Sequence, residues 1–259
     1  MPNVKILSGW SNPGGSTHHH ISLTNLLNSK GVNCTFYGPQ EYHLDKCRSK
    51  MIDKISITPD DILISHFLSV PNDTPTWRQH ILSCHETNLF PLKEYDLKGY
   101  HTIQYVSELQ KDWHGIDHPS VIIPPMVPTV EWKSPENNRA GVIGSIDSHK
   151  RPHLSIQAAL DDGYEKVFLF GDITDLQYYN AEVNPYVERG EAVLLGHESD
   201  REALYGKIEA VYHSSLRETY GLVEAECKLA GIPFRGESNN QPILTKDEIW
   251  ERWESCLDL

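Results

Sequence analysis

Short, nearly continuous apolar runs recur along the chain, and amphipathic stretches separate several of them. Runs of this length are typical of parallel strands that are buried on both faces. In the first half they predict strands over residues 3–9, 33–39, 61–67, 79–85, 100–107 and 120–125. Residues 17–31 have helical spacing and predict a helix that ends at Gly31.

A second series of the same kind follows. It predicts strands over residues 140–145, 166–172, 192–197, 210–215 and 231–238, with helical segments over 151–163, 176–190, 200–208, 221–231 and 245–259. Residues 124–139 lie between the two series, contain four prolines and show little periodicity. A segment of that composition is typical of a linker.

Two successive β/α series predict an α/β protein with two Rossmann-like, doubly wound domains. We expect an N-terminal domain over 1–127, a linker over 128–139, a second domain over 140–245 and a terminal helix over 246–259 that packs back toward the first domain. Ligands of such folds bind beyond the carboxyl ends of the strands. The prediction is therefore a ligand site in a cleft that the two domains face.

Composition narrows the function classes. The chain has 259 residues with a formal net charge of −13, which argues against a broad nucleic-acid surface but leaves room for a local basic patch. No apolar run approaches the ~20 residues of a membrane helix, and the N-terminus carries no secretory core. The five cysteines are scattered without paired spacing. They indicate free thiols and a cytoplasmic location.

The first candidate site follows the first predicted strand. Gly14 and Gly15 precede a helix that we expect Ser16 or Thr17 to cap. Glycines there let a ligand approach the backbone, and free amides at a helix start attract anions. An ordinary tight turn is the alternative, because neither a GxGxxG fingerprint nor a P-loop is present. The histidines at 18–20 cannot all face one metal ion, since adjacent helical residues point about 100° apart.

The second candidate is the stretch GSIDSHKRPH, residues 144–153. Lys150 and Arg151 stand where a helix begins, a place that cations usually avoid because the helix dipole is already positive there. Their presence indicates an anion at this position. A solvated basic turn is the alternative.

The third candidate is the helix after Gly221. With about 100° per residue, Leu222, Val223, Ala225, Leu229 and Ala230 share an apolar arc, and Glu226 falls near its middle. Glu224 and Lys228 are expected to form a solvent-facing pair. A buried carboxylate needs hydrogen-bond donors. Two sugar hydroxyls would supply them, and an ion pair within the core is the alternative.

The fourth candidate is His85, which follows a predicted strand end in LSCHETN. Side chains at such ends gather in α/β active sites. A structural role is the alternative for a single histidine.

Taken together, these segments resemble the GT-B glycosyltransferases of family 4, which carry an E-x7-E signature. NPGGSTHHHISLTNLL is similar to the family's Gly-Gly loop and first helix, and GSIDSHKRPHLSIQAA to its Gly-Arg and Lys-Gly segment. HSSLRETYGLVEAECKLAGIPF holds Glu218 and Glu226 with seven residues between them. The resemblance covers nearly the whole chain, in the family's order.

The resemblance implies a role for each candidate. Glu226 would bind the donor ribose, Glu218 the transferred sugar, and His85 the sugar from the first domain. Lys150 would neutralise the diphosphate. The other donor-binding positions it implies are Gly14, Gly15, Ser145, Arg151, Tyr220, Gly221 and Leu222. Ser145 stands where the family has an arginine, and we expect Arg151 to substitute for that cation.

The implied reaction moves a sugar from a nucleoside diphosphate, with UDP the commonest carrier in the family, to a hydroxyl acceptor with retention of configuration. No cofactor and no metal are expected, because Lys150 and the helix start would stabilise the leaving group. The compact length resembles virus and phage enzymes, so the acceptor is a glycan, a small molecule or a hydroxymethylated DNA base. A catalytically silent nucleotide-sugar-binding module and a sugar-nucleotide epimerase of the same fold are the alternatives. Oligomeric state is not predicted.

Overall fold

The computed structural model describes residues 2–10, 13–66, 78–87, 92 and 97–259. The predicted strand over 61–67 therefore extends by one position, 67, outside the described residues. Contacts divide the chain into two compact units. Unit 1 comprises Met1–Met126 and Pro242–Leu259, and unit 2 comprises Val127–Gln241. The terminal segment thus returns to the unit that holds the N-terminus.

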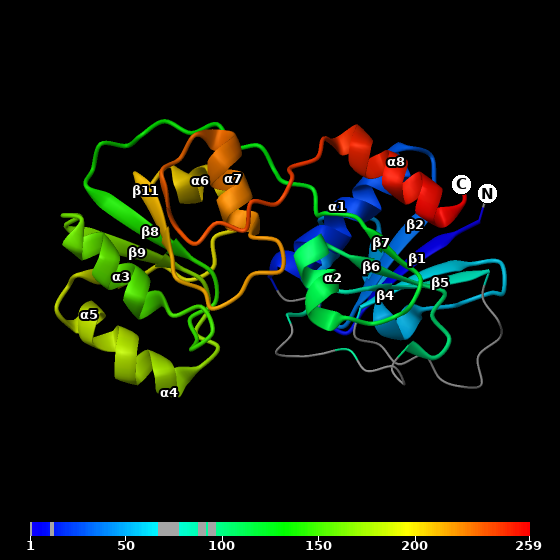
Figure 1. Cartoon of the computed structure of the whole chain (residues 1–259), viewed down its shortest axis with the longest axis horizontal. Coiled ribbons are helices and arrows are strands. Elements are labelled where there is room, and N and C mark those ends of the chain that lie inside the picture. The colour runs from blue at the N-terminus through cyan, green and yellow to red at the C-terminus, as the bar shows by residue number, and fades with distance from the viewer. Residues whose placement is uncertain (1, 11–12, 67–77, 88–91, 93–96) are drawn as a thin grey trace. The chain divides into compact units, whose positions relative to one another are not determined.

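Unit 1 is built on a seven-stranded parallel sheet of order β3-β2-β1-β4-β5-β6-β7 (Figure 1). Its strands are β1 (Val4–Ser8), β2 (Cys34–Gly38), β3 (Ser49–Met51), β4 (Ile62–His66), β5 (Gln79–Ser83), β6 (Thr102–Tyr105) and β7 (Ser120–Ile122). Its helices are α1 (Gly15–Ser29), α2 (Glu108–His114) and α8 (Lys246–Leu257), with short 3-10 turns η1 (Glu41–His43) and η2 (Ile52–Lys54). The six strands predicted for this half are confirmed.

One core in unit 1 joins the two ends of the chain. Leu23 and Leu27 of α1 and Trp253 and Leu257 of α8 pack with strand residues such as Ile6 in a single hydrophobic cluster. Helix α8 begins with a capping box, in which Thr245 and Glu248 exchange hydrogen bonds. The apolar spacing of α8 is thus explained, because its buried side chains complete the core over the sheet.

Unit 2 has a five-stranded parallel sheet of order β10-β9-β8-β11-β12. Its strands are β8 (Arg139–Ile143), β9 (Lys166–Phe170), β10 (Ala192–Leu194), β11 (Ala210–His213) and β12 (Phe234–Gly236). Its helices are α3 (Pro152–Asp161), α4 (Leu176–Tyr178), η4 (Tyr179–Val183), α5 (Asn184–Glu188), α6 (Arg201–Tyr205) and α7 (Leu222–Ala230). Two cores cover its two faces, one with α3 and one with α6 and α7 (Figure 1). The predicted doubly wound α/β class is confirmed.

Three local expectations are wrong. Helix α1 begins at Gly15 with Gly14 as its cap, and neither Ser16 nor Thr17 caps it. The carboxylate of Glu224 accepts from Ser238 and from the Asn239 amide, so it is not a simple solvent-facing partner of Lys228. Leu229, placed in the apolar arc, is 47% exposed.

Candidate active site

Each unit carries a polar cluster at the carboxyl ends of its strands, and the two clusters are described separately. In unit 2 the loop after β8 begins with a close backbone approach. Gly144 and Gly171 both have positive φ, 138° and 157°. A Cβ on Gly171 would lie 1.9 Å from the Gly144 carbonyl oxygen, which only glycine avoids. The stem of Lys150 runs 3.8 Å from where a Gly144 Cβ would stand, an ordinary packing distance, so the positive φ and not the lysine is what favours glycine at this position.

Asp147 organises the same loop. Its Oδ1 accepts from the amides of His149 at 3.0 Å and Lys150 at 2.8 Å. Its Oδ2 accepts from the hydroxyls of Ser145 at 2.6 Å and Thr174 at 3.0 Å. Burial raises the pKa of Asp147, but these four donors outweigh it and the pKa is lowered overall. An ionised Asp147 therefore fixes the backbone that carries Lys150.

The two other basic-loop candidates are already engaged. The Ser145 hydroxyl donates to Asp147, so that side chain is directed into the loop. Arg151 caps α3 in a left-handed conformation, with φ 49°, and its Nε donates to the Ser214 carbonyl at 2.8 Å. Arg151 therefore ties the loop after β8 to the end of β11. The expectation that these side chains are presented directly to a phosphate has no support in these contacts.

Lys150 meets Glu218, which follows β11. The Lys150 ammonium donates to Oε1 of Glu218, and Nε2 of His213 lies 2.9 Å from the same oxygen. The Glu218 and Lys150 side chains are 21% and 26% exposed. Burial raises the pKa of Glu218, but Lys150 and His213 together hold it well below its usual range. Glu218 is consequently a carboxylate at neutral pH and cannot serve as a proton donor there.

The start of α7 lies beside this pair in the chain. Gly221 is the N-cap of the helix, with φ 82°, and as a glycine it offers the first-turn amides no side-chain acceptor. A Cβ on Gly221 would lie 3.0 Å from Nδ2 of Asn239. The positive φ and this short distance both favour glycine at the position. Leu222 is the first helical residue, and Tyr220 before the cap is buried, 4% exposed. Uncapped amides at such a start are suited to an anion.

Glu226 is buried, as its helical phase predicts, but protein groups supply its partners. Its carboxylate is fully buried and accepts from the Tyr205 hydroxyl at 2.5 Å, while Nε of Arg201 lies 3.3 Å from Oε1. Burial raises the pKa of Glu226 despite both partners. The ion pair within the core, left open by the sequence, is what the structure has. Among the described residues Oε1 has no hydrogen-bond partner, so the contact of Glu226 with a donor ribose stays a prediction.

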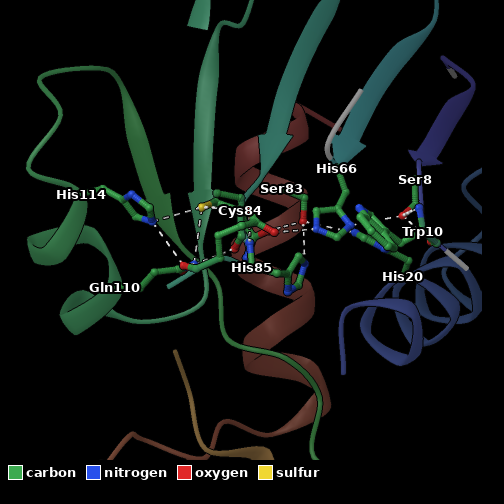
Figure 2. A network of polar contacts seen from close by, with 11 residues as sticks. Ser8, Trp10, His20, His66, Ser83, Cys84, His85, Gln110 and His114 are labelled. Atoms are coloured by element: carbon green, nitrogen blue, oxygen red, sulfur yellow. Dashed lines mark hydrogen bonds and ion pairs between the residues drawn. The ribbon is translucent and has the colours of Figure 1, made fainter. Parts of the chain in front are cut away.

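In unit 1 four imidazole rings pack together where β1, β4 and β5 end. The ring of His85 lies 4.8 Å from that of His19 and 5.1 Å from those of His20 and His66. Figure 2 shows His20, His66 and His85 converging near Ser83, whose hydroxyl is 3.1 Å from Nε2 of His85. The histidine run in the sequence thus contributes two members to the same cluster as His85.

The cluster extends to a buried carboxylate. Oε1 of Glu86 is 2.9 Å from Nε2 of His66. Nδ1 of His66 is 3.2 Å from the Ser8 hydroxyl (Figure 2). The Ser8–His66–Glu86 chain has the residue types of a nucleophilic triad. Ser8 is fully buried, however, and its hydroxyl donates to the Trp10 carbonyl while accepting from the Trp10 amide. Ser8 is thereby committed to holding the turn after β1 and is not an available nucleophile.

The imidazoles of His19, His20 and His85 have lowered pKa values and are neutral at pH 7. Burial first, and then the neighbouring His66, lowers the pKa of His19 to about 4. Burial and the surrounding histidines lower the pKa of both His20 and His85 well below the usual value. Nε2 of His19 and Nδ1 of His20 are buried, and neither has a hydrogen-bond partner among the residues that the structure describes. A neutral ring such as His85 can donate or accept one hydrogen bond to a hydroxyl ligand.

The glycine loop of unit 1 differs from its expected geometry. Gly14 has an extended backbone, with φ −176°, which any residue can adopt. A Cβ on Gly15 would have nothing within 4 Å. Among the described residues, none therefore crowds Gly15 at the start of α1.

The part of the chain that the structure describes shows neither a metal centre nor a membrane-spanning helix. Within that part of the chain, no group of three or more histidine, cysteine, aspartate or glutamate side chains is arranged to hold a metal ion. Within the same part, no helix is long and apolar enough to cross a membrane.

Sequence reasoning missed several members of both clusters. In unit 2 these are Asp147, Arg201, Tyr205, His213 and Asn239, and in unit 1 they are Ser8, His66, Ser83 and Glu86. The rule applied to His85, a polar side chain at or just after a strand end, would have found His66, Ser83, His213 and Asp147. Nothing in the local pattern marks Arg201 or Tyr205 as partners of Glu226, because they lie on another helix.

No protein-family model and no curated protein matches the sequence. Solved structures match it in fold. HepE from Anabaena, solved with UDP and glucose, aligns over 100% of this chain and 90% of its own at 14% identity and a TM-score of 0.69. TarM aligns over 100% of this chain and 92% of its own at 10% identity and a TM-score of 0.70.

A third structure is an alpha-glucosyltransferase solved with UDP and a 13-mer DNA that contains an HMU base. It aligns over 99% of this chain and 90% of its own at 13% identity and a TM-score of 0.62. At these identities the likeness establishes the fold. The chain has the two-sheet GT-B architecture of these proteins.

Proposed function

We propose that the protein is a retaining, metal-independent glycosyltransferase that moves a sugar from a nucleoside diphosphate, UDP in the first instance, to an acceptor hydroxyl. The observation that carries the proposal is the ion pair of Lys150 and Glu218 beside the uncapped start of α7. A cation, free helix amides and a carboxylate thus all follow the carboxyl ends of strands of unit 2. Those groups match a diphosphate joined to a sugar.

In the proposed reaction the anomeric carbon–oxygen bond to the diphosphate breaks and a bond to the acceptor oxygen forms on the same face. The acceptor proton passes to the departing phosphate oxygen. Lys150 and the amides of Gly221 and Leu222 stabilise the negative charge that collects on the diphosphate. Because Glu218 is ionised, it accepts hydrogen bonds from the sugar and supplies no proton.

Unit 1 contributes His85 to the proposal. As a neutral imidazole that is fixed by Ser83 and three neighbouring rings, it presents a single donor or acceptor to a sugar hydroxyl. Such a group orients the sugar without adding charge where the oxocarbenium ion develops. Gly15 stands at the start of α1, where none of the described residues comes within 4 Å of the position of a Cβ.

Glu226 enters the proposal in a changed role. Since its carboxylate accepts a hydrogen bond from Tyr205 and forms an ion pair with Arg201, we assign it to holding α6 against α7. Arg201, whose side chain is 23% exposed, is then the member of this pair that a donor nucleotide can reach.

The acceptor is proposed by class. The net charge of −13 favours a glycan or small molecule over DNA. Because the fold is similar to that of an enzyme solved with DNA, a hydroxymethylated base is also included among the acceptors to be tested.

The test is turnover of UDP-glucose and UDP-N-acetylglucosamine with a panel of sugar and hydroxymethylated-DNA acceptors. Release of UDP together with a glycosylated product supports the proposal, and anomeric analysis of that product decides retention. Tight UDP binding without hydrolysis or transfer would instead favour a silent binding module, which the commitment of Ser145 to Asp147 makes a concrete alternative.

A further inference from the structure

One oxygen of Glu218 serves two donors. The Lys150 ammonium and Nε2 of His213 both bond to Oε1, the latter at 2.9 Å. The two donors come from different strands, since Lys150 follows β8 and His213 is the last residue of β11. Because Glu218 is ionised, Nε2 of His213 carries the proton of this hydrogen bond.

The fold holds His213 firmly. Its backbone pairs with Gly236 of β12, and a Cβ at Gly236 would lie 2.6 Å from the His213 carbonyl oxygen. The imidazole packs on the Phe234 ring with centroids 5.9 Å apart. Its side chain is 12% exposed, less than either Lys150 or Glu218. His213 is therefore the fixed member of this group, and Lys150, on a flexible four-carbon stem, is the member that can move.

The geometry points to a positioning role for His213. We infer that His213 holds Glu218 through Oε1, so that Lys150 can leave the carboxylate for a donor diphosphate without stranding a largely buried charge. An ionised carboxylate without a partner in such a place is costly. With His213 present, that cost is reduced at the moment when the ammonium turns to the ligand. The inference rests on the proposed function, which supplies the diphosphate.

The alternative is that His213 only supports the local fold. A structural role predicts that losing the imidazole weakens ligand binding equally whether or not Lys150 is present. The positioning role predicts that the two residues are coupled, because His213 acts through the movement of Lys150. A double-mutant cycle separates these outcomes.

The experiment measures UDP and UMP binding by calorimetry for wild type, H213L, H213Q, K150M and the H213L/K150M double variant. We expect H213L to weaken UDP binding about tenfold and H213Q, which keeps an N–H donor, to restore it to within about threefold. In the K150M background, H213L should change UDP affinity by less than about twofold. UMP, which lacks the second phosphate, should respond less to H213L than UDP does.

An equal H213L effect with and without Lys150, or no recovery in H213Q, would overturn the positioning role and leave the proposed function standing. Failure of wild-type protein to bind UDP or GDP at all would remove both. The H213Q variant guards against a folding defect in H213L, since it retains the size and polarity of the side chain.

Discussion

Lys150 donates a hydrogen bond to Glu218 across 68 positions of sequence, and so joins the loop after β8 to the segment after β11. The strands that precede these residues are hydrogen-bonded neighbours in the parallel sheet. The ion pair thus follows from the strand order, in which β9 and β10 lie on one side of β8 and β11 and β12 lie on the other. Brought together in this way, the two side chains define the candidate donor site of unit 2.

Replacing Asp147 should loosen the loop that presents Lys150. We expect D147A to cost about 2 kcal/mol in unfolding free energy and to weaken UDP binding about tenfold, because two backbone amides and two hydroxyls lose their acceptor. D147N should be milder, since its amide oxygen still accepts from the amides of His149 and Lys150. Urea unfolding and calorimetry check both effects. Equal losses in D147A and D147N would argue that the charge of Asp147, and not its loop bonds, is what matters.

The buried pair of Glu226 and Arg201 should respond unequally to its two substitutions. R201L leaves a fully buried carboxylate facing only Tyr205, and we expect it to cost about 3 kcal/mol in unfolding free energy. E226Q should cost about 1 kcal/mol, because the Gln side chain keeps the Tyr205 hydrogen bond and Arg201 is partly exposed to water.

Thermal and urea unfolding of the two variants measure the difference. If R201L proves no more costly than E226Q, the carboxylate is not the buried charge that this pairing implies.

Acid should destabilise unit 1 through its histidine cluster. For His19 the folded pKa, about 4, lies below the unfolded value near 6.5, so the unfolded state binds more protons between these values. Stability is therefore fully present above about pH 6.5 and falls as the pH drops toward 4. The His19 shift alone corresponds to about 3 kcal/mol at the lower limit.

Urea titrations across this range test the effect with H19F, which removes an ionisable ring whose Nε2 has no partner. H19F should lose stability less steeply than wild type, and H197Q, at an exposed histidine in unit 2, should follow wild type. Parallel pH curves for wild type and H19F would rule out the cluster as the acid-sensitive element.

Most strands were predictable because parallel strands that are buried on both faces have continuous runs of apolar residues in their sequence. Strand β3 was missed, since Ser49–Met51 lies at the sheet edge and none of its residues is fully buried. The single helix predicted over 176–190 is three segments with a π-helical stretch at Tyr179–Val183. Pro185 lies two residues after the end of that stretch, and it has no N–H to continue a regular α-helical ladder.

The site was predictable only in part. Helical phase indicated that Glu226 is buried, but whether sugar hydroxyls or Arg201 and Tyr205 satisfy it depends on how α6 packs on α7. Strand-end position indicated His85, a cation at a helix start indicated Lys150, and the E-x7-E resemblance indicated Glu218. That Glu218 pairs with both Lys150 and His213 could not be read from spacing, because it follows from strand order and side-chain rotamers.

The central claim is that Lys150 is the diphosphate-binding cation of a nucleotide-sugar site. Calorimetric titration of UDP into wild type, K150M and the matched control K228M, at an exposed lysine on α7, tests it most directly. The account predicts UDP binding by wild type and K228M, and a loss of about 100-fold in K150M. Equal UDP affinity in K150M and wild type would contradict it.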